Sequence, residues 1–270
     1  MNRTYPPGVT CWIDTEQPDP QAAAEFYGGL FGWTFENAMP PGAPGVYLIA
    51  QLDGSDVAAI GPGTGAAQWN TYVAVEDADA AAADVRSAGG SVLAEPEDAG
   101  PGGRAATCAD PQGAPFRLWQ ARRRLGAQTA NLPGAWNFSD LHTNDADAAQ
   151  EFYRSVFGWR YLDLGPDAHR MIVVPGYGDH LAATVDPGIY QRQAGAPEGF
   201  ADAIGSIVPD VDAPHWHVTI SVADRDHSVE RAQALGATLL DTRDGFWADT
   251  ARLRDPQGAE LTLSAFHEPG

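Results

Sequence analysis

Aspartate and histidine side chains occur in the second part of the chain at spacings that suit acid–base chemistry or metal binding. Asp140 and His142 alternate along a strand-like run beginning near Phe138, so these three side chains point to one face of the strand. A carboxylate next to an imidazole is a common general acid/base pair for carbonyl substrates. Together with His217, the pair also provides two imidazoles and a carboxylate, the donor set of a facial metal triad. We favour a third interpretation, a His–Asp pair that only hydrogen-bonds a ligand in a cavity.

Other chemistry-bearing motifs are weaker. His215 lies two residues before His217 and on the same face of the strand, and its simplest interpretation is a surface residue beside a long insertion. No glycine-rich phosphate loop follows a predicted strand, because the glycine-rich run 61–65 is a turn between elements. No G-x-S-x-G nucleophile motif is present in the sequence.

The composition excludes several classes of partner. The 270 residues include 36 Asp and Glu against 16 Lys and Arg, a formal net charge of −20. Such a chain repels nucleic acid and anionic membranes, and it can attract a cationic ligand. The N-terminus lacks the apolar segment of a signal peptide, and no later stretch approaches about 18 apolar residues, so we expect a cytoplasmic protein. The two cysteines, Cys11 and Cys108, are expected to be reduced, half-buried thiols.

The chain repeats itself internally. Residues 19–27 and 145–153 both begin with Asp and end in Glu-Phe-Tyr, and each is followed by a Phe-Gly-Trp tripeptide, at 31–33 and 157–159. A later Asp-Pro-Gln-Gly-Ala sequence occurs at 110–114 and again at 255–259. Because these blocks recur in the same order, we predict a tandem duplication with domains at 1–120 and 135–270 and a linker at 121–134. An insertion at 186–210, rich in Pro and Gly, is predicted to be a loop and a candidate lid.

Each domain is predicted to contain two βαβββ units. In the first unit, a strand at 9–15 precedes a helix that opens at Asp19 or Pro20, and strands follow at 46–50 and 57–60. The second unit repeats this order between residues 69 and 120. We therefore predict an α+β fold in which four units form two curved sheets, each concave enough to hold a ligand. How the four units pair is left open.

At these motifs the sequence resembles the vicinal oxygen chelate superfamily, which includes glyoxalase I, bleomycin resistance proteins and extradiol dioxygenases. The resemblance covers nearly the whole chain except the linker and the insertion. It is nearest to a two-domain actinobacterial branch, some of whose members accompany anthracycline and other antibiotic pathways. It implies glyoxalase-like domains but leaves the activity open.

The resemblance also implies where a metal would bind: a His on the first strand, a carboxylate at the end of the fourth, a His on the fifth and a Glu on the eighth. Counting along the repeats gives the corresponding residues in the two halves, which are Trp12 and Phe138, Ile60 and Thr184, Asn70 and His217, and Arg117 and Thr262. His217 alone among these eight can ligate a metal in the expected way, so we predict that the inherited metal site is lost and that no cofactor is required.

The same resemblance implies which side chains line the two cavities. They are Trp12, Asp14, Asn70, Tyr72, Arg117 and Trp119 in the first half, and Phe138, Asp140, His142, His217, Thr219, Thr262 and Ser264 in the second. Aromatic planes with a few polar groups suit a flat, partly polar organic molecule. A carboxylate such as Asp14 beside Trp12 can also pair with an ammonium group.

We therefore expect metal-independent binding of an aromatic or polyketide-like small molecule in specialised metabolism, for antibiotic sequestration or a biosynthetic accessory role. One alternative is a glyoxalase-superfamily lyase, isomerase or oxygenase that uses His217, Asp140 and His142 for catalysis. Another is an interaction protein that uses only the fold. The partner is a small molecule, and the protein is expected to be a monomer or a homodimer.

Overall fold

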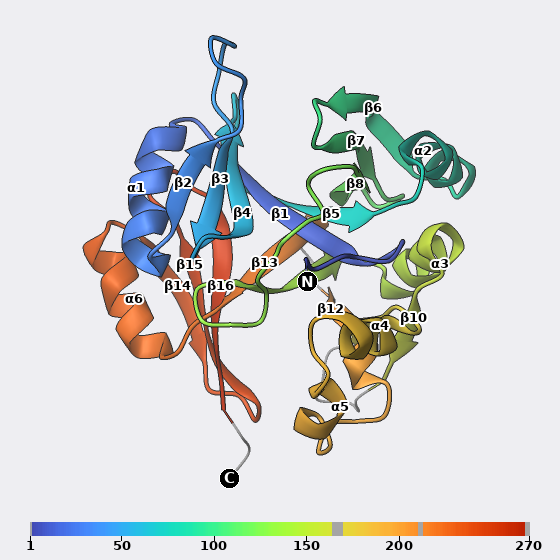
Figure 1. The fold of residues 1–270 in the computed structure, drawn as a ribbon. Coiled ribbons are helices and arrows are strands. Elements are labelled where there is room, and N and C mark those ends of the chain that lie inside the picture. The colour runs from blue at the N-terminus through green and yellow to red at the C-terminus, as the bar shows by residue number, and fades with distance from the viewer. Residues whose placement is uncertain (1, 164–169, 210–212, 268–270) are drawn as a thin grey trace. The chain divides into compact units, whose positions relative to one another are not determined.

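The fold has the predicted α+β class and contains two eight-stranded sheets (Figure 1). It is known from a computed structural model that describes residues 2–163, 170–209 and 213–267. The first half contains β1 (Thr10–Gln17), α1 (Pro20–Phe31), β2 (Thr34–Asn37), β3 (Leu48–Leu52), β4 (Ser55–Pro62), β5 (Gln68–Ala74), α2 (Ala78–Ser87), β6 (Ser91–Ala99), β7 (Gly103–Ala109) and β8 (Pro115–Ala121).

The second half repeats this order with extra helices. It contains β9 (Trp136–Thr143), α3 (Ala146–Phe157), β10 (Arg160–Leu162), β11 (Arg170–Val173), α4 (Tyr177–Thr184), α5 (Ile189–Arg192), a 3-10 turn (Phe200–Asp202), β12 (Ala203–Pro209), β13 (His215–Ser221), α6 (Arg225–Ala234), β14 (Thr238–Arg243), β15 (Ala248–Arg254) and β16 (Glu260–Phe266). The predicted βαβββ order is therefore confirmed in all four modules, although the third is interrupted between β11 and β12.

Aspartates start the module helices. Asp19 caps α1 by accepting hydrogen bonds from two backbone N–H groups at the helix start, and Asp145 does the same for α3 with one. Both helices end at a glycine in the left-handed region, Gly32 with φ 76° and Gly158 with φ 71°. A side chain is strained in that conformation, which explains the glycine in each repeated Phe-Gly-Trp.

The strand order shows how the modules form sheets. The first sheet has the order β2-β3-β4-β1-β5-β8-β7-β6 and the second β10-β11-β12-β9-β13-β16-β15-β14. Each half of the sequence therefore supplies one complete sheet. In both halves the first and last strands of each module, in chain order, pair in parallel, as in β1 with β4 and β5 with β8.

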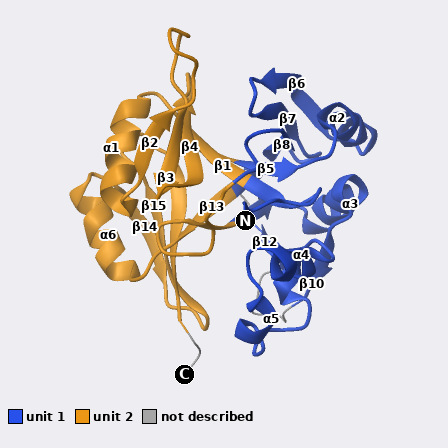
Figure 2. Ribbon diagram, viewed as in Figure 1, with its two compact units in different colours: residues 1–11, 71–126, 139–216 blue, residues 12–70, 127–138, 217–270 orange. Residues whose placement is uncertain are grey.

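The two compact units of the structure do not coincide with the two repeated halves of the sequence. Unit 1 comprises residues 1–11, 71–126 and 139–216, and unit 2 comprises residues 12–70, 127–138 and 217–270 (Figure 2). Each unit thus takes one module from each half of the chain. Within unit 2, α1 and α6 lie side by side, and Arg231 of α6 donates to the carbonyl of Gly29 in α1.

The two repeated motifs meet inside these units. In unit 2, Asp255 of the Asp-Pro-Gln-Gly turn accepts 2.7 Å hydrogen bonds from the hydroxyl of Tyr27 and from Nε2 of Gln17. In unit 1, the Tyr153 hydroxyl donates to Asp110 at 3.3 Å. Burial raises the pKa of Tyr27 and of Tyr153 well above the ordinary value, so both phenols stay protonated donors. Each helix of the Glu-Phe-Tyr motif is therefore tied to a turn from the other half of the sequence.

The repeated tryptophans are core residues. Trp33 and Trp159 are 4% and 0% exposed. Their indole N–H groups donate 2.7 Å hydrogen bonds to the carbonyls of Gly134 and Gly8. These glycines have φ 83° and 85°, a conformation that places the carbonyl where each indole meets it.

The predicted loop at 186–210 is wrong over much of its length, although Asp210 itself lies outside the described residues. Residues 203–209 form β12, which pairs antiparallel with β11 and parallel with β9. Thr184, assigned to the end of the fourth strand, ends helix α4 instead. The fourth-strand position belongs to Ile207, which lies opposite Leu141 as Ile60 lies opposite Thr15. The extra chain was inserted before this strand and not after it, which sequence spacing did not show.

Two further expectations concern the cysteines and membranes. Cys11 and Cys108 are free, as expected, but both are 0% exposed and not half-buried. Burial raises the pKa of the Cys108 thiol to about 12, which keeps it protonated and unreactive. Among the described residues, no helix is long and apolar enough to span a bilayer.

Candidate functional site

Alternation along the strands places the predicted site residues on one face of each strand. On β9, Leu141 and Thr143 are buried, whereas Phe138, Asp140 and His142 are half-buried on the opposite face. The same pattern holds on β8 for Arg117 and Trp119 and on β16 for Thr262 and Ser264. These side chains therefore belong to the sheet face that does not pack into the buried core of β8, β9 and β16.

A first cluster lies in unit 2 around a buried carboxylate. Asp14 on β1 is 1% exposed; its Oδ1 accepts from Nδ2 of Asn70 on β5 at 2.8 Å, and its Oδ2 accepts from the Tyr47 hydroxyl at 2.9 Å. The indole N–H of Trp12 donates to the same hydroxyl at 3.3 Å. Sequence reasoning identified Trp12, Asp14 and Asn70 but missed Tyr47, which lies in the strand predicted at 46–50 and directly precedes β3 in the structure.

A second cluster lies in unit 1 around a guanidinium group. Nη1 of Arg117 donates to the Tyr72 hydroxyl at 2.7 Å, and the guanidinium carbon lies 5.4 Å from the centre of the Tyr72 ring. Trp119 meets Tyr72 edge to face at 6.3 Å and donates its indole N–H to the carbonyl of Arg124. Strand pairing puts Arg117 directly opposite Tyr72, so the three predicted residues form one cation and aromatic cluster.

The polar residues of the second half have partners of their own. Oδ1 of Asp140 accepts from the backbone N–H of Ser206 at 2.8 Å and from its hydroxyl at 2.7 Å. Nε2 of His217 lies 2.8 Å from the Thr262 hydroxyl. Thr219 lies opposite Thr262 in the register of β13 with β16, and Ser264 lies two residues further on. The proposed pairing of Asp140 with His142 stays a prediction. The contact with Ser206 was not predicted, because the sequence did not indicate strand β12.

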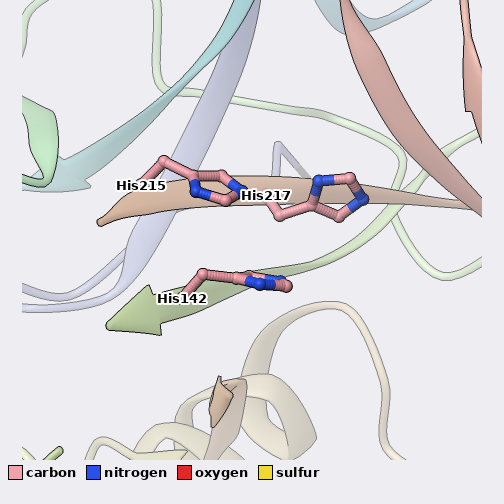
Figure 3. Close-up of side chains that lie close together, drawn as sticks. All are labelled: His142, His215 and His217. Atoms are coloured by element: carbon pink, nitrogen blue, oxygen red, sulfur yellow. The ribbon is translucent and has the colours of Figure 1, made fainter. Parts of the chain in front are cut away.

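Three imidazoles gather at β9 and β13. The rings of His142 and His215, both in unit 1, stack with centroids 4.7 Å apart and planes 21° apart. His217 follows two residues after His215 on β13, so it lies on the same face (Figure 3). The potential ligand atoms of the three side chains all lie within 4.8 Å of one another. His215, which is partly exposed, is therefore also a member of this group; the signal that identifies it is the His-x-His spacing on a strand.

The metal positions implied by the resemblance do not fit a metal in either half. In the first half these positions are Trp12, Ile60, Asn70 and Arg117; the register places Ile60 opposite Thr15 and Arg117 opposite Tyr72, and Ile60 is fully buried. In the second half they are Phe138, Ile207, His217 and Thr262. A ring, an aliphatic side chain and a guanidinium cannot supply the three or four convergent donors that a divalent metal needs.

Comparison with known proteins gives one consistent family. The family model described as "Glyoxalase-like domain" matches residues 11–119 and 138–264. The chain is 35% identical to a protein named CFP32 from Mycobacterium tuberculosis, covering 96% of this chain and 95% of that one. It is also 35% identical to the anthracycline biosynthesis protein DauV of Streptomyces sp. strain C5, covering 98% and 95%. Among solved structures, a Mn(II)-bound glyoxalase from Novosphingobium aromaticivorans has the same fold, with a TM-score of 0.61, 15% identity, and coverage of 98% of this chain and 83% of that one.

Proposed function

This chain belongs to the glyoxalase-like family of the vicinal oxygen chelate superfamily, and we propose that it binds an aromatic, polyketide-type small molecule without a metal at the family positions. The relatives named as anthracycline biosynthesis proteins support this class of ligand. The proposed role is sequestration of such a molecule or assistance in its biosynthesis.

The proposal depends on the position of Arg117. It occupies the eighth-strand position to which the resemblance assigns a metal-binding glutamate, directly opposite Tyr72. A guanidinium there opposes metal binding and instead presents N–H donors to a ligand oxygen. Tyr72 and Trp119 add aromatic surface next to these donors. A flat molecule with carbonyl or phenolic oxygens matches this combination of charge and rings.

The cluster around Asp14 supports the same ligand class. Within unit 2, Trp12 supplies an aromatic plane and Tyr47 already donates to the carboxylate, so the polar groups of this cluster are ordered in advance. Preorganised polar groups reduce the entropy that binding costs. A cationic group on the ligand, matched to Asp14, stays a prediction.

The test is calorimetric titration with an anthracycline and with its sugar-free aglycone. We expect the wild type to bind equally well before and after EDTA treatment. Arg117→Gln should weaken binding by about 10- to 100-fold, because it removes a hydrogen bond from a charged group, which contributes about 1.5–3 kcal/mol.

Arg160→Gln is the matched control, since Arg160 is exposed at the start of β10, and it should leave the dissociation constant unchanged. An Arg117→Gln variant that binds as tightly as the wild type would contradict the proposal, as would binding that requires added metal.

Catalysis is the second candidate, favoured by the imidazole group on β9 and β13. His217 is 6% exposed and hydrogen-bonded to Thr262, an arrangement that orients a general acid or base. Incubation of the same anthracyclines with the protein, followed by mass analysis of the products, tests this candidate. Product formation that His217→Gln abolishes would support an enzyme over a binding protein.

A further inference from the structure

The group of three histidines on β9 and β13 has the composition of a metal site. We propose that His142, His215 and His217 bind a divalent transition metal, at a place that differs from the one the family uses. Two relations define the group: the stacking of His142 on His215, and the two-residue spacing of His215 and His217 along one strand. The potential ligand atoms of the three side chains lie within 4.8 Å of one another.

Hydrogen bonds prepare two of the rings for this role. Nδ1 of His215 lies 2.8 Å from the carbonyl oxygen of Ala213. A carbonyl can only accept, so Nδ1 carries the proton, and Nε2 is the nitrogen of the neutral ring that can ligate a metal. His217 has the Thr262 hydroxyl as partner of its Nε2. Metal-binding imidazoles in proteins are oriented by such a bond to the second ring nitrogen.

The spacing of the rings fits a small cation after a modest closure. Bonds of about 2.0–2.1 Å from a tetrahedral metal to imidazole nitrogen imply about 3.3 Å between ligand nitrogens. The nitrogens in this structure, within 4.8 Å of one another, need to approach by about 1.5 Å at most. Rotation about the side-chain bonds of half-buried His142 and His215 supplies such a movement, and their partial exposure provides an entry route.

The donor set indicates the class of metal and the coordination. Imidazole suits Zn²⁺, Ni²⁺, Co²⁺ and Cu²⁺, whereas Mg²⁺ and Ca²⁺ prefer oxygen. Three protein ligands leave a fourth position for water or a ligand atom. The proposed centre shares His217 alone with the family positions. His142 lies four residues after Phe138, and His215 lies two residues before His217.

The inference is independent of ligand binding through Arg117, because Arg117 contributes to the first sheet and the histidines lie on strands of the second. The two proposals can therefore fail separately. Arg117→Gln should bind metal as the wild type does, so a loss of anthracycline binding in this variant would leave the metal site untouched.

Titration of the chelator-treated protein with Co²⁺ alone tests the site. We expect one equivalent to bind and to give the visible absorption of tetrahedral cobalt. His142→Asn and His215→Asn should each abolish that absorption. His215→Cys should retain the metal and add a thiolate-to-cobalt charge-transfer band, which a merely structural role of His215 would not produce.

His227→Asn is the matched control, because His227 is an exposed residue of α6, and it should bind one equivalent. Circular dichroism of each variant establishes that it is folded before titration. The proposal is overturned if the folded wild type binds no cobalt, if His142→Asn and His215→Asn bind it like the control, or if His215→Cys shows no thiolate band.

Discussion

Two tyrosine hydroxyls donate hydrogen bonds to the buried aspartates of the repeated turns. Asp255 is 5% exposed; its Oδ1 accepts from three backbone N–H groups of its own turn, and its Oδ2 accepts from Tyr27 and Gln17. A buried carboxylate is stable only when its hydrogen-bonding capacity is used. The tyrosine therefore does more than fill space in the core, which explains why both repeats carry Tyr at this place and not only Phe.

Replacing Tyr27 by Phe tests this role. We expect Tyr27→Phe to lower the free energy of unfolding by about 1–3 kcal/mol, because the Oδ2 of Asp255 loses a short hydrogen bond while remaining buried. Urea denaturation at neutral pH measures the loss.

The control for this substitution is Tyr190→Phe. Tyr190 is 51% exposed and donates to the exposed Asp179, so its removal should change the free energy by less than about 0.5 kcal/mol. Equal changes in the free energy of unfolding for the two substitutions would show that the buried hydrogen bond stabilises the fold no more than the exposed one.

At the scale of elements, the helices that interrupt the third module are part of the core. Tyr177 and Leu181 of α4 and Ile189 of α5 are 6%, 6% and 5% exposed and belong to the buried cluster of unit 1. Arg3 also donates to the Tyr177 hydroxyl at 3.1 Å, which ties the N-terminal segment to α4. A segment with buried anchors is unsuited to the opening and closing of a lid.

Leu181→Ala distinguishes a packed element from a loosely attached lid. If α4 is packed into the core, Leu181→Ala should lower the free energy of unfolding by about 2–5 kcal/mol, the usual result of truncating a buried leucine. Thermal and urea denaturation both report it.

Leu93→Ala provides the comparison, since Leu93 on β6 is 62% exposed and should tolerate truncation within about 0.5 kcal/mol. A lid attached only by its ends would make Leu181→Ala as harmless as Leu93→Ala.

For the whole molecule, the division into compact units makes the two halves of the sequence interdependent. Unit 2 contains Tyr27 from the first half and Asp255 from the second, and unit 1 contains Asp110 and Tyr153 in the reverse arrangement. Within unit 1, Phe116 of β8 packs edge to face on Phe152 of α3 at 6.3 Å. The buried surface of each half is thus covered by residues of the other half.

Expression of the halves 1–134 and 135–270 tests this interdependence. We expect neither half alone to give a monomer with a cooperative unfolding transition, because each exposes the apolar surface that its counterpart covers. Co-expressed halves should purify together and unfold cooperatively. A monomeric single half with a sharp calorimetric transition would contradict the expectation.

The sequence alone determined the properties that depend on short stretches of chain. The repeated aspartates predicted the helix starts at Asp19 and Asp145, and strand alternation predicted that Asp140 and His142 share a face with Phe138. The resemblance, which rests on motifs in a fixed order, predicted the fold class. Caps and alternation are set by neighbours in the chain, so they can be recognised without the fold.

Only the tertiary structure decided which distant residues meet. Nothing in the sequence distinguishes Asp255 from Asp110 as the partner of Tyr27, since both turns read Asp-Pro-Gln-Gly. The stacking of His142 on His215, the contact of Tyr47 with Asp14, and the return of residues 203–209 as β12 likewise depend on packing between segments far apart in the chain. Such contacts follow from the burial of whole faces, and the identity of the residues at each end does not specify them.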